Sequence, residues 1–162
     1  LWQLCQLAYP GSLEEIFETI NWVDEVSGIV NGWSFERFKV FHDASVDPHG
    51  YRLEHSSGAN LVHSGDTGPC ETLYQAIERS SIAIVEMGIP EWVPSEEHHK
   101  PSDIEVLSQR VPNTKLLLTH TYLDMSDSEF EVLMSNQYPI FSSNVTHAYD
   151  GICLKWDGQN WN

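Results

Sequence analysis

Apolar and polar residues alternate with a period of two through the first part of the chain, which predicts strands rather than helices. Clusters of Gly, Ser, Asn and Asp separate the alternating segments and predict turns between them. The expected strands cover residues 19–26, 35–42, 50–54 and 59–63. Residues 11–18 fit either a short helix end or an ordered turn. We therefore predict that this region forms antiparallel strands.

After Asp66 the pattern changes to helices that alternate with short apolar strands. Residues 69–79 place Leu73, Ala76 and Ile77 on one helical face. This change of period in mid-chain predicts that the second part of the molecule covers a sheet with helices.

Two further helices are expected downstream. One covers residues 102–110, entered through Pro101 with Ser102 as its N-cap, and the other covers residues 126–135. The strands expected in this part are residues 81–85, 115–119, 144–147 and 151–156. The whole order predicts an α+β fold of layered type, with helices on the outer face of the sheet.

The length and composition indicate one globular domain over residues 1–162. The chain is 41% hydrophobic, which suffices for one core, and it contains no run of 18 apolar residues, so we expect no membrane partner. The N-terminal LWQLCQLAYPG has neither a basic segment nor a small-residue cleavage site, which argues against a signal peptide. The cysteines are odd in number and form no CxxC pair, which favours a reducing, cytoplasmic location: Cys5, Cys70 and Cys153.

The charge balance is strongly acidic. Twenty-four Asp and Glu residues oppose eight Lys and Arg residues, and the formal net charge is -16. Such a surface repels phosphate backbones at long range, which counts against general nucleic-acid binding. A local cationic site remains compatible with it, because bound divalent metal ions dominate the field in a pocket.

Three candidate ligands stand just after predicted strands. His42 and His120 each follow a strand, and Asp66 follows another inside a Gly-flanked turn. Side chains at such positions often build functional sites, and His and Asp suit zinc or a similar metal. From these residues alone a structural reading stays open, in which Asp66 is only a turn residue and His120 only caps its strand.

Four stretches in order resemble the second half of the metallo-β-lactamase superfamily. They read LVHSGDTGPCETL, SIAIVE, HHKPSDIEVLSQ and KLLLTHTY, and the nearest likeness is to the ribonuclease Z and phosphodiesterase-like branch. The resemblance runs from about residue 20 to residue 156. It implies a four-layer αβ/βα sandwich, of which this chain supplies mainly the second, C-terminal half.

The resemblance also implies roles for five residues. His42 would bind one metal ion, Asp66 would bridge two, and His120 would bind the second. His98 matches the family histidine that acts near the scissile phosphate, as a proton donor or as a stabiliser of developing charge, and Glu86 would orient His98 or another histidine. His49 is the rival of His42, and His99 is the rival of His98.

The implied chemistry is hydrolysis of a phosphodiester by a hydroxide that two divalent metal ions activate. Zinc is the expected metal, with manganese or iron as alternatives. Two such ions about 3.5–4 Å apart also neutralise charge on the phosphoryl oxygens. In this scheme His98 would protonate a leaving oxygen as a general acid.

The motif His-x-His-x-Asp-His, which the family uses for its first ligands, is absent from these residues. Each metal ion would then keep two protein ligands, fewer than the usual three of a catalytic zinc. Three explanations stay open: a fragment of a longer protein, a second chain that completes the site, or a degenerate and non-catalytic half-domain. We favour the fragment, because the N-terminus starts in mid-pattern.

The segment between the Tyr51 strand and the Gly65 turn bears on the substrate. Only 13 residues lie between these two positions, too few for the tRNA-gripping arm found in one form of ribonuclease Z. Together with the acidic charge, this favours a small or short phosphodiester, or another small ester or lactone, over a structured tRNA. A homodimer stays open as an assembly.

Overall fold

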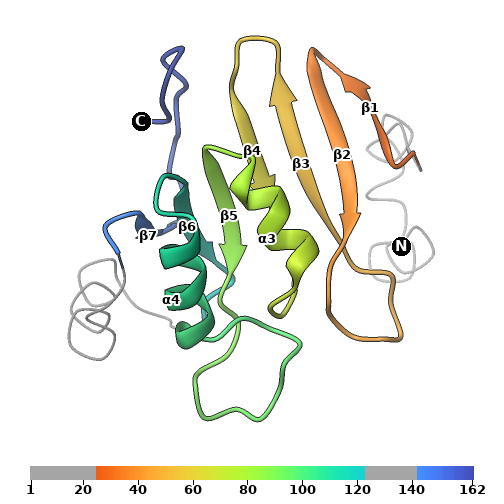
Figure 1. Ribbon diagram of the computed structural model, residues 1–162, viewed down its shortest axis with the longest axis vertical. Coiled ribbons are helices and arrows are strands. Elements are labelled where there is room, and N and C mark those ends of the chain that lie inside the picture. Colours follow the sequence, from red (N-terminus) through yellow and green to blue (C-terminus); the bar gives the residue numbers. More distant parts are fainter. Residues whose placement is uncertain (1–24, 123–141) are drawn as a thin grey trace, which may run out of the picture.

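The computed structural model describes residues 25–122 and 142–162, which form a mixed sheet of seven strands with two helices (Figure 1). The strands are β1 (Ser27–Val30), β2 (Trp33–Lys39), β3 (His49–His55), β4 (Asn60–His63), β5 (Ile82–Glu86), β6 (Lys115–Thr119) and β7 (Val145–His147). The helices are α3 (Glu71–Glu78) and α4 (Pro101–Arg110). Neither of these two helices is long and apolar enough to cross a membrane.

The sheet has an antiparallel and a parallel part, and its strands lie side by side in chain order. Strands β1 to β4 pair antiparallel through short connections, whereas β4 to β7 pair parallel. Parallel neighbours need a long crossover, and α3 and α4 supply the crossovers from β4 to β5 and from β5 to β6. The predicted order, strands first and helix–strand alternation afterwards, is confirmed.

The core lies between the sheet and the two helices, which cover the same face (Figure 1). The predicted apolar side of α3 is confirmed, because Leu73, Ala76 and Ile77 are buried. They pack with Ile104 and Leu107 of α4. The sheet residues of this core alternate along their strands: Phe38, Val62, Ala83, Val85, Leu116 and Leu118.

The opposite face of the sheet also carries apolar side chains, beside polar ones at Arg37 and His63. Phe35, Leu53 and Leu61 stand opposite one another on three neighbouring strands, and Ile84 pairs with Leu117 farther along. Phe35 and Leu53 line a hollow of about 320 Å³ at this part of the sheet. A sheet with apolar side chains on both faces is typical of an inner layer of a sandwich.

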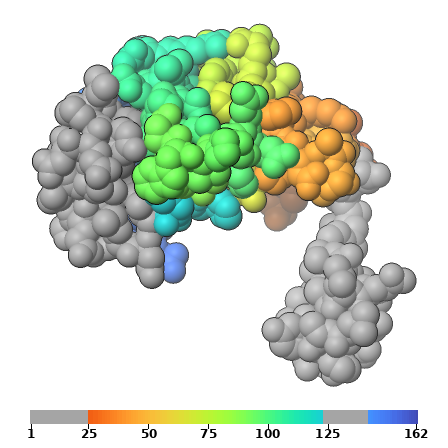
Figure 2. All heavy atoms as spheres, turned by 90° about the horizontal axis from the view of Figure 1, so that it is seen from below, coloured from red at the N-terminus to blue at the C-terminus, as the bar shows by residue number. Residues whose placement is uncertain are grey.

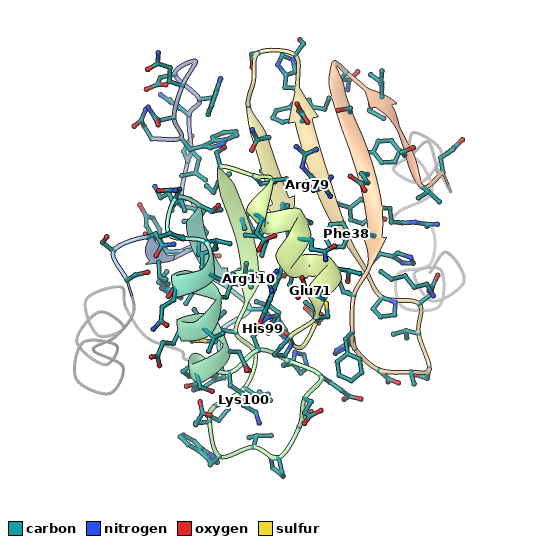
Figure 3. All side chains as sticks on the ribbon, viewed as in Figure 1. Phe38, Glu71, Arg79, His99, Lys100 and Arg110 are labelled. Atoms are coloured by element: carbon teal, nitrogen blue, oxygen red, sulfur yellow. The ribbon has the colours of Figure 1, made fainter. Side chains whose placement is uncertain are left out.

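Arg110 ties the two helices together on the outside. Its guanidinium donates to Glu71 at 2.7 and 2.8 Å and to Glu78 at 2.7 Å, and it lies 5.4 Å from the ring centre of Tyr74 (Figure 3). The hydrogen bonds from Arg110 lower the pKa of the Glu71 carboxyl to about 2. The arrangement fixes how α3 and α4 lie on the sheet.

The predicted N-cap of α4 is wrong. The helix begins at Pro101, and the cap is Lys100, whose N–H donates to the Asp103 carboxylate at 2.9 Å. Pro suits the first helical position because it has no N–H to lose there, so the cap falls one residue before it. Ser102 instead donates its hydroxyl to Glu91 at 2.8 Å.

Two strand predictions also differ from the structure. Residues 151–156 form no strand, and Trp156 makes only an isolated bridge with Trp161. Its indole N–H donates to the Ser57 carbonyl at 3.3 Å, so the apolar side chain packs on the β3–β4 turn instead of extending the sheet. In the predicted strand 19–26, residues 25 and 26 precede β1 rather than belong to a strand.

Some predictions concern residues that lie outside the described ranges. They concern the strand at 19–24, the alternatives at 11–18, the helix at 126–135 and the thiol of Cys5.

Candidate active site

The predicted site residues gather at one edge of the sheet, the lower edge in Figure 1. Strands β4, β5 and β6 are parallel, and β2 runs in the same direction because it is antiparallel to β3. Their carboxyl ends therefore meet at this edge, where open α/β sheets bind ligands. His42 follows β2, Asp66 follows β4, Glu86 ends β5 and His120 follows β6.

A loop of residues 87–100 adds His98 to this edge. The His98 ring stands 4.8 Å from the ring of His42, edge to face, and 5.9 Å from the ring of His120, almost stacked. Figure 2, which views the molecule from this side, shows the green surface of the loop beside the orange surface of the residues after β2. Sequence order and topology thus bring together all five residues singled out above.

Glu86 is buried, with 1% of its surface exposed, and its carboxylate accepts four hydrogen bonds. Oε1 accepts from the N–H of Thr67 at 3.0 Å, the N–H of His99 at 3.2 Å and Nδ1 of His98 at 3.0 Å. Oε2 accepts from the N–H of Gly88. Burial raises the pKa of the Glu86 carboxyl, and these hydrogen bonds with the charge of His98 act against that rise.

The two ring nitrogens of His98 therefore differ: one is held in a hydrogen bond to Glu86, and the other is available to a substrate. Nδ1 donates to Glu86, so Nε2 is the nitrogen that can hold or release a proton at the site. The side chain keeps 22% of its surface exposed, which leaves it accessible from solvent. The geometry suits a general acid whose orientation a buried carboxylate fixes.

His42 is oriented by the same loop. Its Nδ1 lies 2.9 Å from the carbonyl oxygen of Glu97. Because a carbonyl oxygen only accepts, Nδ1 carries the proton and the lone pair of the neutral ring lies on Nε2. Ligating histidines are commonly oriented in this way, with the other ring nitrogen donating to a carbonyl or carboxylate.

Asp66 and His120 face each other across the edge. Asp66 Oδ2 lies 4.0 Å from His120 Nε2, and both side chains are about half exposed, at 49% and 55%. Two donors on one zinc ion, with bonds of about 2.0–2.1 Å in tetrahedral geometry, stand roughly 3.3 Å apart. The observed pair is slightly wider than this, within reach of a small side-chain rotation.

The backbone of His120 is left-handed, with φ of 47°. Histidine adopts this region more readily than most residues, yet it remains uncommon and is frequent at functional sites. It turns the chain sharply after β6.

These donors fit one side of a metal site. Within residues 25–122 and 142–162, no three His, Cys, Asp or Glu side chains converge closely enough to hold one ion. Asp66 with His120 suits two donors to a shared ion, and His42 presents a lone pair nearby, but a catalytic zinc usually has three protein ligands. The described residues therefore fit a metal ion as an incomplete donor set.

The two rival histidines have other contacts. His99 is fully buried, its Nδ1 donates to the Thr67 carbonyl at 2.6 Å, and burial lowers its pKa to about 4. Figure 3 shows it beside the lower ends of α3 and α4. His49 donates from Nδ1 to the Asp47 carbonyl at 2.8 Å. In this structure His98 and His42 are the members of each pair that face one another.

Sequence reasoning missed two residues of the site. Thr67 is buried, and its hydroxyl accepts the N–H of Phe41 at 3.2 Å, which joins the Asp66 turn to the segment before His42. A Cβ at Gly88 would stand 2.8 Å from His98 Nδ1 and 3.2 Å from His120 Cδ2, so this glycine keeps the space between the two rings open. The available signal was a glycine two residues after the end of a strand.

The fold is similar to that of solved proteins with the metallo-β-lactamase fold. YhfI of Bacillus subtilis shares 15% identity at a TM-score of 0.64, over 88% of this chain and 61% of that protein. The isothiocyanate hydrolase of Delia radicum gut bacteria shares 14% identity at a TM-score of 0.63, over 81% of this chain and 57% of that protein. The short form of human tRNase Z shares 16% identity at a TM-score of 0.52, over 78% of this chain and 46% of that protein. Models of known protein families and curated proteins give no match.

At these identities the similarity shows the fold. The chain has the α+β metallo-β-lactamase fold predicted for it, and it spans between 46% and 61% of the length of these three proteins. It therefore supplies a part of the sandwich, which agrees with a sheet that carries apolar side chains on both faces. That this part is the C-terminal half, and that it belongs to the ribonuclease Z branch, stay predictions.

Proposed function

We propose that the chain is the site-bearing part of a metal-dependent hydrolase that cleaves small phosphodiesters. One observation carries this proposal: the Asp66–His120 pair and the Glu86–His98 pair stand at the same edge of the sheet, with the His98 and His120 rings 5.9 Å apart. Potential metal ligands and a potential proton donor are thus neighbours, as hydrolysis of an ester requires.

Two divalent metal ions, with zinc expected first, would supply charge neutralisation and an activated water when bound. Asp66 and His120 would hold them from one side, and a carboxylate suits a bridging position because it has two oxygens. His42 would contribute Nε2, the nitrogen left free by its bond to the Glu97 carbonyl. The remaining donors would have to come from outside the described residues.

His98 would transfer the proton. Its Nδ1–H bond to Glu86 fixes the ring, and Nε2 would protonate the leaving oxygen when the phosphorus–oxygen bond breaks. Glu86 would act only through His98, because it is buried and its oxygens already accept hydrogen bonds from Thr67, Gly88 and His99.

The choice of substrate rests on chain length and charge. The short connection from Tyr51 to Gly65 and the net charge of -16 favour a small ester over a structured tRNA. Trp92, in the loop that carries His98, is 77% exposed and could contact such a substrate. The similar structures include an isothiocyanate hydrolase and a tRNase, so this one fold serves different substrates. Another small ester or a lactone is the second candidate substrate.

The test is hydrolysis of bis(4-nitrophenyl) phosphate, a lactone and a thioester by the product of the complete gene, with added zinc or manganese. We expect phosphodiester cleavage, reduced about 10²–10⁴-fold in kcat by His98→Gln, as for loss of a general acid. His55→Gln, at the end of β3 and away from the site, is the matched control and should leave the rate unchanged. A faster lactone or thioester reaction would favour the second candidate, and no reaction with any of the three would contradict the proposal.

A further inference from the structure

The loop of residues 87–100 crosses directly over the turn that follows β4, and at Gly68 this crossing has no room for a side chain. A Cβ there would stand 1.7 Å from the carbonyl oxygen of Glu96 and 2.8 Å from its carbonyl carbon. Real Cβ contacts are never so short, and both atoms belong to the backbone, so no side-chain rotation could relieve the overlap. A side chain at position 68 would have to move one of the two segments.

Gly68 itself is firmly held. Its N–H donates to the Phe41 carbonyl at 2.8 Å, and the two residues form an isolated antiparallel bridge. The preceding Thr67 is buried, and its N–H donates to Glu86 at 3.0 Å. Since the turn is fixed from both sides, the loop would be the segment that moves.

The moving segment contains the groups that orient two of the site histidines. Glu96 is followed by Glu97, whose carbonyl accepts the Nδ1–H of His42 at 2.9 Å. Next comes His98, whose Nδ1 donates to Glu86 at 3.0 Å. A displacement of the Glu96 carbonyl by an ångström or more would weaken both bonds, because hydrogen bonds are lost beyond about 3.5 Å.

We propose that Gly68 is a positioning residue: its missing side chain lets the 87–100 loop lie on the Asp66 turn, and this contact orients His42 and His98. The inference rests on the proposed function for what those two histidines do. The contact itself is independent of any metal ion or substrate.

The test is Gly68→Ala in the 162-residue chain, read by long-range ¹H–¹⁵N NMR correlations of the histidine rings without added metal. Above the titration range of histidine, each ring shows which nitrogen carries the proton. We expect His42 and His98 in the wild type to show protonated Nδ1, and we expect both signals to shift toward mixed tautomers in Gly68→Ala. His55, bonded to Ser57 away from the site, should not change.

Gly28→Ala is the matched control. Its Cβ would meet only the ring end of Phe35 at 2.9 Å, on a flexible side chain at the β1–β2 edge. This variant makes the same Gly-to-Ala change with a milder crowding that a side-chain rotation can relieve, and it does not touch the loop. We expect wild-type signals for His42 and His98.

Ser95→Ala serves if Gly68→Ala does not fold. Ser95 Oγ accepts the N–H of Glu97 at 3.2 Å, so its loss loosens the loop without crowding the turn, and the His42 signal should shift by a smaller amount. Folded Gly68→Ala with unchanged His42 and His98 signals would overturn the proposal, and so would unchanged signals in Ser95→Ala where Gly68→Ala is unfolded. If the histidine signals shift as expected but the product of the complete gene binds no metal, only the proposed function is contradicted.

Discussion

The site has two parts that differ in burial and in completeness. The buried hub, formed by Thr67, Glu86 and His99, is at most 1% exposed and joins the turn after β4, the end of β5 and the loop before α4. The exposed rim, formed by His42, Asp66 and His120, is partly open to solvent, and the donor atoms of Asp66 and His120 stand 4.0 Å apart.

The difference between hub and rim shows which part of the site the described residues form by themselves. The carboxylate of the hub accepts four hydrogen bonds, all from within the chain, so its geometry needs no further component. The rim presents metal donors without a set of three around one point in the described residues. Residues 25–122 and 142–162 thus build the support of the site in full and its ligand set in part.

The largest effect is expected from breaking the hub. Glu86→Ala would leave His98 and the buried N–H groups of Thr67 and His99 without their acceptor, at a cost of about 3 kcal/mol or more in the free energy of unfolding. Urea denaturation measures this loss. Glu54→Ala, an exposed carboxylate paired with Arg52, is the control and should cost less than about 1 kcal/mol. Equal losses in the two variants would remove the distinction between hub and surface.

The hub should also give the chain a dependence on pH. Burial lowers the pKa of His99 to about 4 from 6.5. Between these two values the unfolded chain therefore binds a proton at His99, whereas the folded chain does not. Stability should therefore fall as pH decreases from 6.5 to about 4, by roughly 3 kcal/mol from this residue. His99→Gln keeps a donor for the Thr67 carbonyl and does not titrate. Urea denaturation across this range should show a weaker dependence in the variant, and identical slopes would count against a buried neutral His99.

Substitutions in the rim should affect metal binding strongly and stability little. Asp66→Ala and His120→Asn remove half-exposed side chains, and Asn also tolerates the left-handed backbone at position 120. Each should change the free energy of unfolding by about 0.5 kcal/mol or less, while zinc binding measured by calorimetry weakens at least tenfold. A loss of stability as large as that of Glu86→Ala would place these residues in the hub instead.

The smallest effect is expected on the helices outside both parts. Arg110→Gln removes the donor that lowers the pKa of Glu71 to about 2, so this pKa should rise toward its ordinary value in an NMR titration. The histidine signals of the rim should stay unchanged. A change in the His42 signal would mean that the rim depends on the α3–α4 contact as well.

The sequence predicted the frame of the site better than its interior. Asp66 and His120 could be found because Asp66 lies in the turn after one strand and His120 directly follows another, and parallel strands bring such positions to one edge. The helices and strands between residues 33 and 122 follow from periodicity in the same way, with boundaries shifted by a few residues, whereas β1 at residues 27–30 was not predicted.

The interior depends on contacts that periodicity does not encode. His98 and His99 are adjacent in the chain, and only the path of the 87–100 loop decides that one faces His42 and the other is buried against Thr67. Gly88 carried no sequence signal for the rings that surround it, because these come from segments far apart in sequence. The missing strand at 151–156 has a similar cause: the apolar alternation there serves side-chain packing, not pairing.

The central claim is that the rim of this chain is one side of a working metal centre. The most direct test is elemental analysis of the purified product of the complete gene, beside its Asp66→Ala variant. We predict near-stoichiometric zinc or manganese in the wild-type protein and its loss in Asp66→Ala. A wild-type protein without metal, or a variant that keeps it, would contradict the account.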